Sequence, residues 1–291
     1  MTNAAGDGPG PARIASWLAI GIPLAFLLVV FIYPMVNILA TGFSGEDGAL
    51  TAFGDVFSRP SLRGVAWFTL WQAVASTLLT LVVAMPAAYV FARYEFPGRT
   101  LLRAAVTIPF VMPTLVVGSA FLALLGPNGA LGFDLSASIW AILLAHVFYN
   151  YAVVVRTVGG LWSHLDPRLE EAARMLGAGR WKTFWTVTLP LLRPAIAAAA
   201  SIIFLFTFTS FGVILVLGNL QYRTIEIEIW RQTVSFLNLP VAAALSVLQL
   251  VAVSLILLAY SRYQERRAVE QTLAPAASTA RRPHGYREWT T

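Results

Sequence analysis

The amino-acid sequence predicts an all-α integral membrane protein with six transmembrane helices. Of its 291 residues, 58% are apolar and only 12% are Asp, Glu, Lys or Arg, about half the charged share of an ordinary soluble domain. The charged residues leave six long uncharged stretches, at residues 14–45, 64–92, 104–133, 135–155, 194–222 and 232–261. About 20 apolar residues in a helix cross a hydrocarbon core of about 30 Å, so each stretch can contain one spanning helix.

The uncharged stretches divide the chain into a transmembrane domain at 14–265 and two short ends. The expected spans lie at about 14–41, 64–92, 104–126, 135–155, 194–218 and 239–261. A loop at 156–193 separates the fourth span from the fifth. Residues 1–13 are rich in Gly, Pro and Ala, and residues 266–291 form a tail or linker without apolar periodicity. Both ends are expected to be disordered.

The positions of Lys and Arg predict the orientation of the chain in the membrane. With six spans, the two termini and the loops after spans two and four share one side, which carries 16 Lys and Arg residues. The other side carries four, namely Arg59, Arg63, Arg223 and Arg231. Because basic loops stay in the cytoplasm, we expect a multi-pass protein of the cell (inner) membrane with both termini and the 156–193 loop cytoplasmic.

The first stretch is expected to be a retained span rather than a cleaved secretory signal. The apolar region of a signal peptide runs for about 7 to 15 residues. Here 32 uncharged residues follow Arg13. This length favours a helix that stays in the membrane.

The composition excludes several chemistries. With no Cys and only three His residues, far apart in the sequence, the chain lacks the ligands for a thiolate or zinc site, and no metal or other cofactor is expected. No catalytic residues are predicted either. The phosphate-loop pattern G-x-x-x-x-G-K-[ST] is absent, so energy for active transport has to come from a partner.

The loop at 156–193 is patterned as two short helices joined by a tight turn. Asp166 and Pro167 are a typical helix start, because the carboxylate caps free amides and proline fits the first helical position. Gly177 and Gly179 are expected to supply a left-handed stop. The apolar residues of the first helix recur at helical spacing: Leu165, Leu169, Ala172, Ala173 and Leu176. A second segment, 180–187, is expected to end at Leu189-Pro190.

This loop resembles the EAA loop of binding-protein-dependent ABC transporter permeases. That family's pattern is E-A-A, three residues, G, nine residues, I, one residue, L-P. The chain matches it with Glu171-Ala172-Ala173, Gly177, Val187 and Leu189-Pro190, and departs only in having Val187 in place of Ile. The resemblance extends over roughly residues 14–265 and implies the type I importer (MetI-like) permease fold.

The resemblance implies that the loop couples the membrane helices to a cytoplasmic ABC ATPase dimer. By this resemblance the coupling residues are Glu171, Ala172, Ala173, Gly177, Leu189 and Pro190. Small Ala side chains let a partner surface approach closely, and Glu171 offers a charge to a basic group. Two alternatives remain open. An amphipathic helix pair can rest on lipid headgroups, and a helix-turn-helix can read DNA, although a loop tethered at both ends to the bilayer makes a nucleic-acid partner the weaker expectation.

Further segments resemble the thiamine and ferric-iron branch of these permeases. They are residues 108–114, 209–218 and 224–233. The resemblance implies import of thiamine or ferric iron delivered by an extracytoplasmic solute-binding protein. In that branch one polypeptide often carries two homologous halves, and this chain resembles the first half. A second permease chain or half is therefore an expected partner, together with membrane lipid.

His146 and Asn150 are candidate residues of the transport pathway. They lie four residues apart and share one face of the fourth span. A carrier needs polar groups inside the bilayer that face protein or water. The alternative is that they hydrogen-bond to neighbouring helices and hold the bundle together. Gln72 and Gln249 carry the same ambiguity.

The extracytoplasmic segment 222–231 has two competing interpretations. Ile225, Ile227 and Ile229 alternate with Glu226 and Glu228, which is typical of a strand. The family resemblance instead implies a short interfacial helix near the gate.

The sequence favours an ATP-driven importer over two other classes. An ATP-independent channel or ion-coupled carrier is expected to have charged residues within its spans, and the six stretches contain none. An intramembrane enzyme needs a nucleophile with a base or a metal site, for which the sequence offers no candidate.

Overall fold

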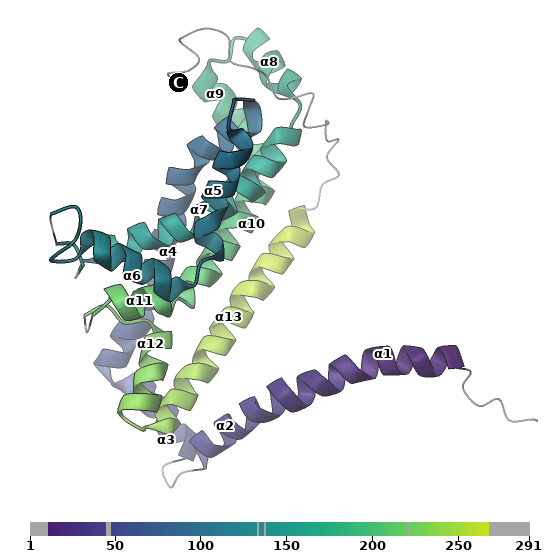
Figure 1. The fold of residues 1–291 in the computed structure, drawn as a ribbon. Coiled ribbons are helices and arrows are strands. Elements are labelled where there is room, and N and C mark those ends of the chain that lie inside the picture. The colour runs from purple at the N-terminus through teal and green to yellow at the C-terminus, as the bar shows by residue number, and fades with distance from the viewer. Residues whose placement is uncertain (1–10, 45–47, 133, 137, 220, 268–291) are drawn as a thin grey trace, which may run out of the picture.

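The computed structural model describes residues 11–44, 48–132, 134–136, 138–219 and 221–267, and these residues form an all-helical bundle (Figure 1). The described part of the chain contains no strand. Most of the expected disordered ends, 1–13 and 266–291, lies outside the described residues. Pro11–Arg13 already belong to the first helix, and the last helix continues to Arg267.

The first span stands apart from the bundle over most of its length. It consists of α1 (Pro11–Leu27), a π-helical turn (Leu28–Ile32) and α2 (Tyr33–Phe43). Its apolar window, Leu18–Asn37, is 0% buried within the chain, and Figure 1 shows α1 projecting away from the other helices. This continuous apolar surface suits lipid or a second subunit. The short α3 (Gly48–Ser58) follows and packs on the last helix, and of the first span only α2 packs on these two helices.

Two long helices, α4 (Pro60–Arg93) and α7 (Ile139–His164), form the centre of the bundle. Small side chains let them approach closely. A Cβ atom on Gly159 of α7 would lie 3.2 Å from the carbonyl oxygen of Ala88 on α4. Because α4 has 34 residues, it is about 50 Å long and extends beyond a hydrocarbon core of about 30 Å.

The third span is bent, which corrects the expectation of one helix at 104–126. It consists of α5 (Arg99–Val111) and α6 (Thr114–Leu125), which meet at an angle of 103°. The bend lies at Met112-Pro113, because a residue before proline is driven out of the helical conformation. Met112 has ψ 144°. Among the described residues, five helices are long and apolar enough to span a membrane, and this bent pair makes a sixth candidate.

The fifth span differs from the prediction at both ends. Its helix begins earlier than expected, within the loop, and it is interrupted near its end. The helices are α8 (Pro167–Met175), α9 (Arg180–Thr183), a π-helical turn (Phe184–Thr188), α10 (Leu189–Phe208) and α11 (Gly212–Leu217). Leu189-Pro190 does not end the segment that begins at Arg180. The π-helical turn adjusts the hydrogen bonding just before the proline, and Leu189 N donates to Phe184 O. The expected span 194–218 is interrupted at 209–211.

The segment at 222–231 is a helix, so the strand interpretation is wrong and the helix implied by resemblance is confirmed. It is α12 (Ile225–Trp230), followed by a π-helical turn (Arg231–Ser235) and α13 (Leu239–Arg267). Ile227 and Glu228 are both buried although they are adjacent. The alternation of Ile and Glu therefore does not mark one buried and one solvated face. Figure 1 shows α8 and α9 at one end of the bundle and α3 and α12 at the other.

Candidate functional site

The candidate coupling helix, α8, begins and ends as its sequence predicts. The Asp166 carboxylate accepts a hydrogen bond from Arg168 N at 2.9 Å, and Pro167 occupies the first helical position. Gly177 has φ +86°, the left-handed conformation that ends the helix, so this part of the prediction is confirmed. Gly179 has φ −67° and ψ 165° and instead precedes α9, so its predicted role in the stop is wrong.

The neighbour of the motif glutamate, Glu170, attaches α8 to two other helices. Arg93, at the end of α4, donates to Glu170 Oε1 at 3.0 Å and to Leu165 O at 3.1 Å. Thr188 Oγ1, at the start of α10, donates to Glu170 Oε1 at 3.1 Å. Arg93 is 7% exposed. Glu170 also lies 3.7 Å from Arg174 within α8. The sequence analysis did not identify Arg93 or Thr188, because both are distant from Glu170 in the sequence.

The opposite side of α8 is open. Glu171 and Ala172 are exposed, and Ala173 is half-buried. The two large apolar residues before the turn are the most exposed, Met175 at 87% and Leu176 at 89%. The predicted apolar face is therefore buried only at Leu165. Large apolar side chains concentrated at the tip of a loop are typical of a contact surface for another protein.

Leu189 and Pro190 lie where the loop joins the membrane helix. Both are half-buried at the first turn of α10, and Val187 is half-buried in the π-helical turn before them. The residues that match the EAA pattern thus fall into two groups. One group lies on the open surface of α8, and the other lies at the junction with α10. The exposed Trp181 and Trp185 lie between these two parts.

The candidate pathway residues lie in a buried polar core between α4, α7 and the break after α10. His146 is 2% exposed, and its Nδ1 and Nε2 lie 2.9 Å from the hydroxyls of Ser76 and Ser210, respectively. Asn150 is 1% exposed and donates to His146 O at 3.0 Å. The structure brings both residues together, but inside the chain's own packing. This geometry favours the structural alternative for His146.

The two glutamine candidates are also bonded within the chain. Gln72 Nε2 donates to Thr207 O at 2.7 Å, which ties α4 to α10. Gln249 Nε2, on α13, donates to Glu226 Oε1 at 2.6 Å. Burial raises the pKa of the Glu226 carboxyl above its usual value, and the hydrogen bond from Gln249 partly offsets this.

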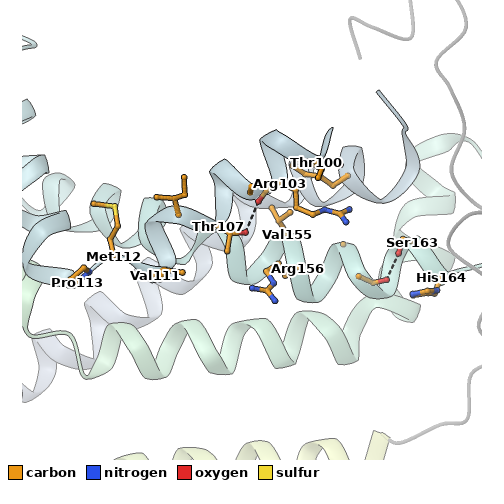
Figure 2. Close-up of a pocket in the computed structure, with 15 residues that line it drawn as sticks. Thr100, Arg103, Thr107, Val111, Met112, Pro113, Val155, Arg156, Ser163 and His164 are labelled. Carbon is orange, nitrogen blue, oxygen red and sulfur yellow. Dashed lines mark hydrogen bonds between the residues drawn. The ribbon is translucent and has the colours of Figure 1, made fainter. Parts of the chain in front are cut away.

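A groove of about 1170 Å³ lies between α5 and α7 (Figure 2). It runs from Ser163 and His164, beside α8, to the bend at Met112-Pro113. Its lining includes Arg103 on α5 and Arg156 on α7. Among the residues that the structure describes, no group of three or more His, Asp or Glu side chains is placed to hold a metal ion.

Comparisons with known proteins assign the chain to a family. The model of the family described as "Binding-protein-dependent transport system inner membrane component" matches residues 80–270. The chain is 31% identical over 259 residues to the sulfate transport system permease protein CysT of Escherichia coli (strain K12), covering 86% of this chain and 92% of that protein. The chain therefore belongs to the inner membrane components of binding-protein-dependent transport systems.

The chain is also similar to a thiamine permease in sequence and to an alginate transporter in structure. The chain is 31% identical over 251 residues to the thiamine transport system permease protein ThiP of Brucella abortus (strain 2308), covering 82% of this chain but 45% of that protein. A crystal structure of a bacterial alginate ABC transporter, in complex with an alginate pentasaccharide-bound periplasmic protein, matches with a TM-score of 0.71 at 18% identity, covering 90% of this chain and 98% of that chain. The fold is that of a type I ABC importer permease, and the family is one of transporter permease subunits.

Proposed function

We propose that this chain is the sulfate-translocating permease subunit of an ABC importer in the cytoplasmic membrane. Its partners are a cytoplasmic ATPase dimer, a second permease chain or half, and an extracytoplasmic solute-binding protein. The family membership supports the importer class. The alginate transporter, which has the same fold, was crystallised with a periplasmic protein, and this supports a binding protein as the source of the cargo.

The exposed side of α8 is the observation that carries the coupling role. Glu170 holds one side of this helix to α4 and α10. Glu171, Ala172, Met175 and Leu176 are left exposed on the rest of it. A partner that binds this open side pushes or pulls on two membrane helices through one carboxylate. We assign Glu171, Ala172, Ala173 and Gly177 to the ATPase contact, and Leu189 and Pro190 to the junction that passes movement into α10.

Sulfate replaces thiamine or ferric iron as the proposed cargo. The sulfate permease CysT matches nearly the whole of this chain and 92% of its own length. The thiamine permease ThiP is equally identical, but this chain spans only 45% of it. Thiamine remains the second candidate because of the ThiP match.

The proposed orientation places both termini and α8 in the cytoplasm. The excess of Lys and Arg on that side supports it. The separation of α8 from α12 at opposite ends of the bundle agrees with it (Figure 1). Because the chain has no Cys, single cysteines beside Arg156 and Arg231 can be labelled in intact cells. Labelling of the Arg156 position by an impermeant reagent added outside would contradict this orientation.

Uptake of radiolabelled sulfate tests the function. The chain is expressed with its neighbouring ATPase, permease and binding-protein genes in cells that lack their own sulfate importer. We expect ATP-dependent accumulation of sulfate, and no accumulation when the ATPase is inactivated. Accumulation of labelled thiamine without sulfate would select the second candidate. Accumulation of any solute by this chain alone, without nucleotide hydrolysis, would instead indicate a channel or ion-coupled carrier.

A further inference from the structure

The groove between α5 and α7 follows most of the length of α5. Its lining on α5 runs from Thr100 to the bend at Pro113, which is about 20 Å at 1.5 Å per residue. On α7 it runs from Val155 to His164, next to the coupling loop. The groove therefore reaches from the α8 end of the bundle to the break in the third span.

The groove carries positive charge and no negative charge. Arg103 and Arg156 line it, and none of its fifteen lining residues is Asp or Glu. Both arginines are exposed. In the described part of the chain, no carboxylate lies within ion-pairing distance of either guanidinium. Arg103 lies over the ring of Phe91, with Cζ 5.8 Å from the ring centre. Figure 2 shows the two arginines on neighbouring helices along the groove.

Two arginines without acidic partners make this groove attractive to anions. Two less exposed arginines, by contrast, have acidic partners: Arg93 has Glu170 and Arg223 has Glu228. A guanidinium presents donors in a planar fork that matches the oxygens of a tetrahedral anion. Apolar walls, such as Ile108 and Val111, lower the local dielectric constant and focus the field of the charges. The same field repels a cation.

We propose that the α5–α7 groove is the cytoplasmic half of an oxyanion path, in which Arg103 and Arg156 attract a tetrahedral dianion and pass it toward the cytoplasm. The proposal rests on the proposed sulfate function. The phosphate of a lipid headgroup has the same chemistry as free sulfate, so the experiment has to separate these two sources. Two arginines, rather than a closed cage, suit a path, because an anion that is bound weakly can leave.

Cysteine labelling measures the anion preference without relying on transport. The chain has no native Cys, and Thr107 lines the groove with its hydroxyl bonded only within its own helix, to Arg103 O. Thr107→Cys is introduced into the full transporter complex in nanodiscs of neutral phosphatidylcholine. The labelling rates of this chain by thiosulfonate reagents of equal size, one anionic and one cationic, are compared. We expect the anionic reagent to react about 10-fold faster than the cationic one.

The arginines have to be the cause of this preference. We expect Arg103→Gln with Arg156→Gln to bring the ratio of the two rates near 1. The control variant Arg262→Gln, which removes a charge from the end of α13 outside the groove, leaves the ratio unchanged. Equal rates in the parent variant, or a preference that survives the double substitution, would overturn the proposal.

The two sources of the anion are separated by adding each of them. Free sulfate slows labelling of Thr107→Cys in neutral nanodiscs if the groove accepts the free dianion. The alternative outcome is that sulfate has no effect, whereas nanodiscs in which about a fifth of the lipid is anionic phosphatidylglycerol abolish the faster labelling by the anionic reagent. In that case the groove holds lipid headgroups, and its role in the path is overturned. These readouts do not require sulfate to be the cargo, so they remain informative if the uptake assay selects thiamine.

A bulky side chain placed in the groove tests whether solute passes through it. Gly160 lines the groove, and a Cβ atom there has nothing within 4 Å, so Gly160→Leu adds a side chain at the groove wall from an unobstructed position. We expect sulfate uptake to fall at least tenfold while the ATPase still co-purifies. The matched control is Gly64→Leu on α4, where a Cβ atom is equally unobstructed and no groove is present. Unchanged uptake in a correctly assembled Gly160→Leu transporter would refute the path.

Discussion

Arg93 and Glu170 form a largely buried ion pair that joins the end of α4 to the coupling helix. Arg93 Nη2 lies 3.0 Å from Glu170 Oε1, and the side chains are 8% and 20% exposed. The second guanidinium contact, to Leu165 O, holds the residue just before the helix cap. Because Glu170 also accepts from Thr188, one carboxylate links α4, α8 and the start of α10. Under the proposed coupling role, a displacement of α8 would therefore act on both helices.

Breaking this pair is expected to uncouple transport from ATP hydrolysis. Arg93→Gln leaves Glu170 without its main partner, and losing one member of a buried pair costs about 3 kcal/mol. We expect sulfate uptake to fall at least tenfold, while the ATPase still co-purifies and hydrolyses ATP. Uptake and ATPase activity are measured in the same proteoliposomes. Restoration of uptake by the exchange Arg93→Glu with Glu170→Arg would support the pair, and unchanged coupling in Arg93→Gln would refute it.

Reversing the charge at Glu171 is expected to prevent ATPase binding without affecting membrane insertion. Glu171 is exposed on the open side of α8, so Glu171→Lys removes no internal contact that the structure shows. The control is Glu95→Lys, another exposed glutamate, in the segment before α5; it additionally loses an exposed ion pair with Arg99 at 3.9 Å, which is worth little to stability. Co-purification of the ATPase is the measurement. Equal recovery with both variants would argue strongly against docking at α8.

The His146 core distinguishes a structural role from a pathway role. Both imidazole nitrogens are bonded, to Ser76 and to Ser210. His146→Ala loses both bonds and leaves a cavity, so we expect about 2–4 kcal/mol of destabilisation. Ser76→Ala is expected to cost about 1 kcal/mol. Thermal unfolding in detergent and the KM of uptake are measured together. A changed KM with an unchanged unfolding midpoint would return His146 to the pathway.

The close contact between α6 and α11 is expected to tolerate only glycine at position 212. A Cβ atom there would lie 2.6 Å from Leu115 N and would also clash with Thr114. Since backbone atoms cannot move aside cheaply, Gly212→Ala is expected to destabilise the protein by about 1–3 kcal/mol. The control, Gly64→Ala, meets nothing within 4 Å and is expected to be neutral or to stabilise α4 by about 0.5–1 kcal/mol. Equal unfolding midpoints for the two variants would contradict this packing.

Because the Glu226 carboxyl is partly buried, we expect the stability of the protein to depend on pH. Burial raises its pKa in the folded protein above the unfolded value. The folded state therefore holds this proton to higher pH, so its contribution to stability is greatest below the unfolded pKa and is lost as the pH rises through the folded pKa. Glu226→Gln cannot ionise, so it does not lose stability as the pH rises, and its side-chain oxygen can still accept a hydrogen bond from Gln249. We expect the variant to unfold at a higher temperature than the parent at pH 8 and at a similar temperature at pH 4. A difference that is the same at both pH values would exclude Glu226 as its source.

Several features of the site were predictable because they depend on neighbours in sequence. The Asp166 cap, Pro167 at the first turn and the left-handed Gly177 each follow from local backbone chemistry, and the structure has all three. The α12 helix is different. Its alternating Ile and Glu residues predict a strand, but Glu228 is held by Arg223, Arg231 and Gln232, and the surrounding helices bury both faces. Periodicity alone does not anticipate such an environment.

The long uncharged stretches by themselves determined that this chain is helical and lies in a membrane, since lipid leaves every backbone group to be satisfied within its own helix. The spacing of the EAA pattern likewise determined which loop is the candidate for coupling. Only the tertiary structure decided that Glu170 rather than Glu171 is tied to Arg93, and that Arg103 and Arg156 line one groove. Those relationships join residues 50 to 80 positions apart, and their energies depend on burial and distance, which exist only once the helices are packed.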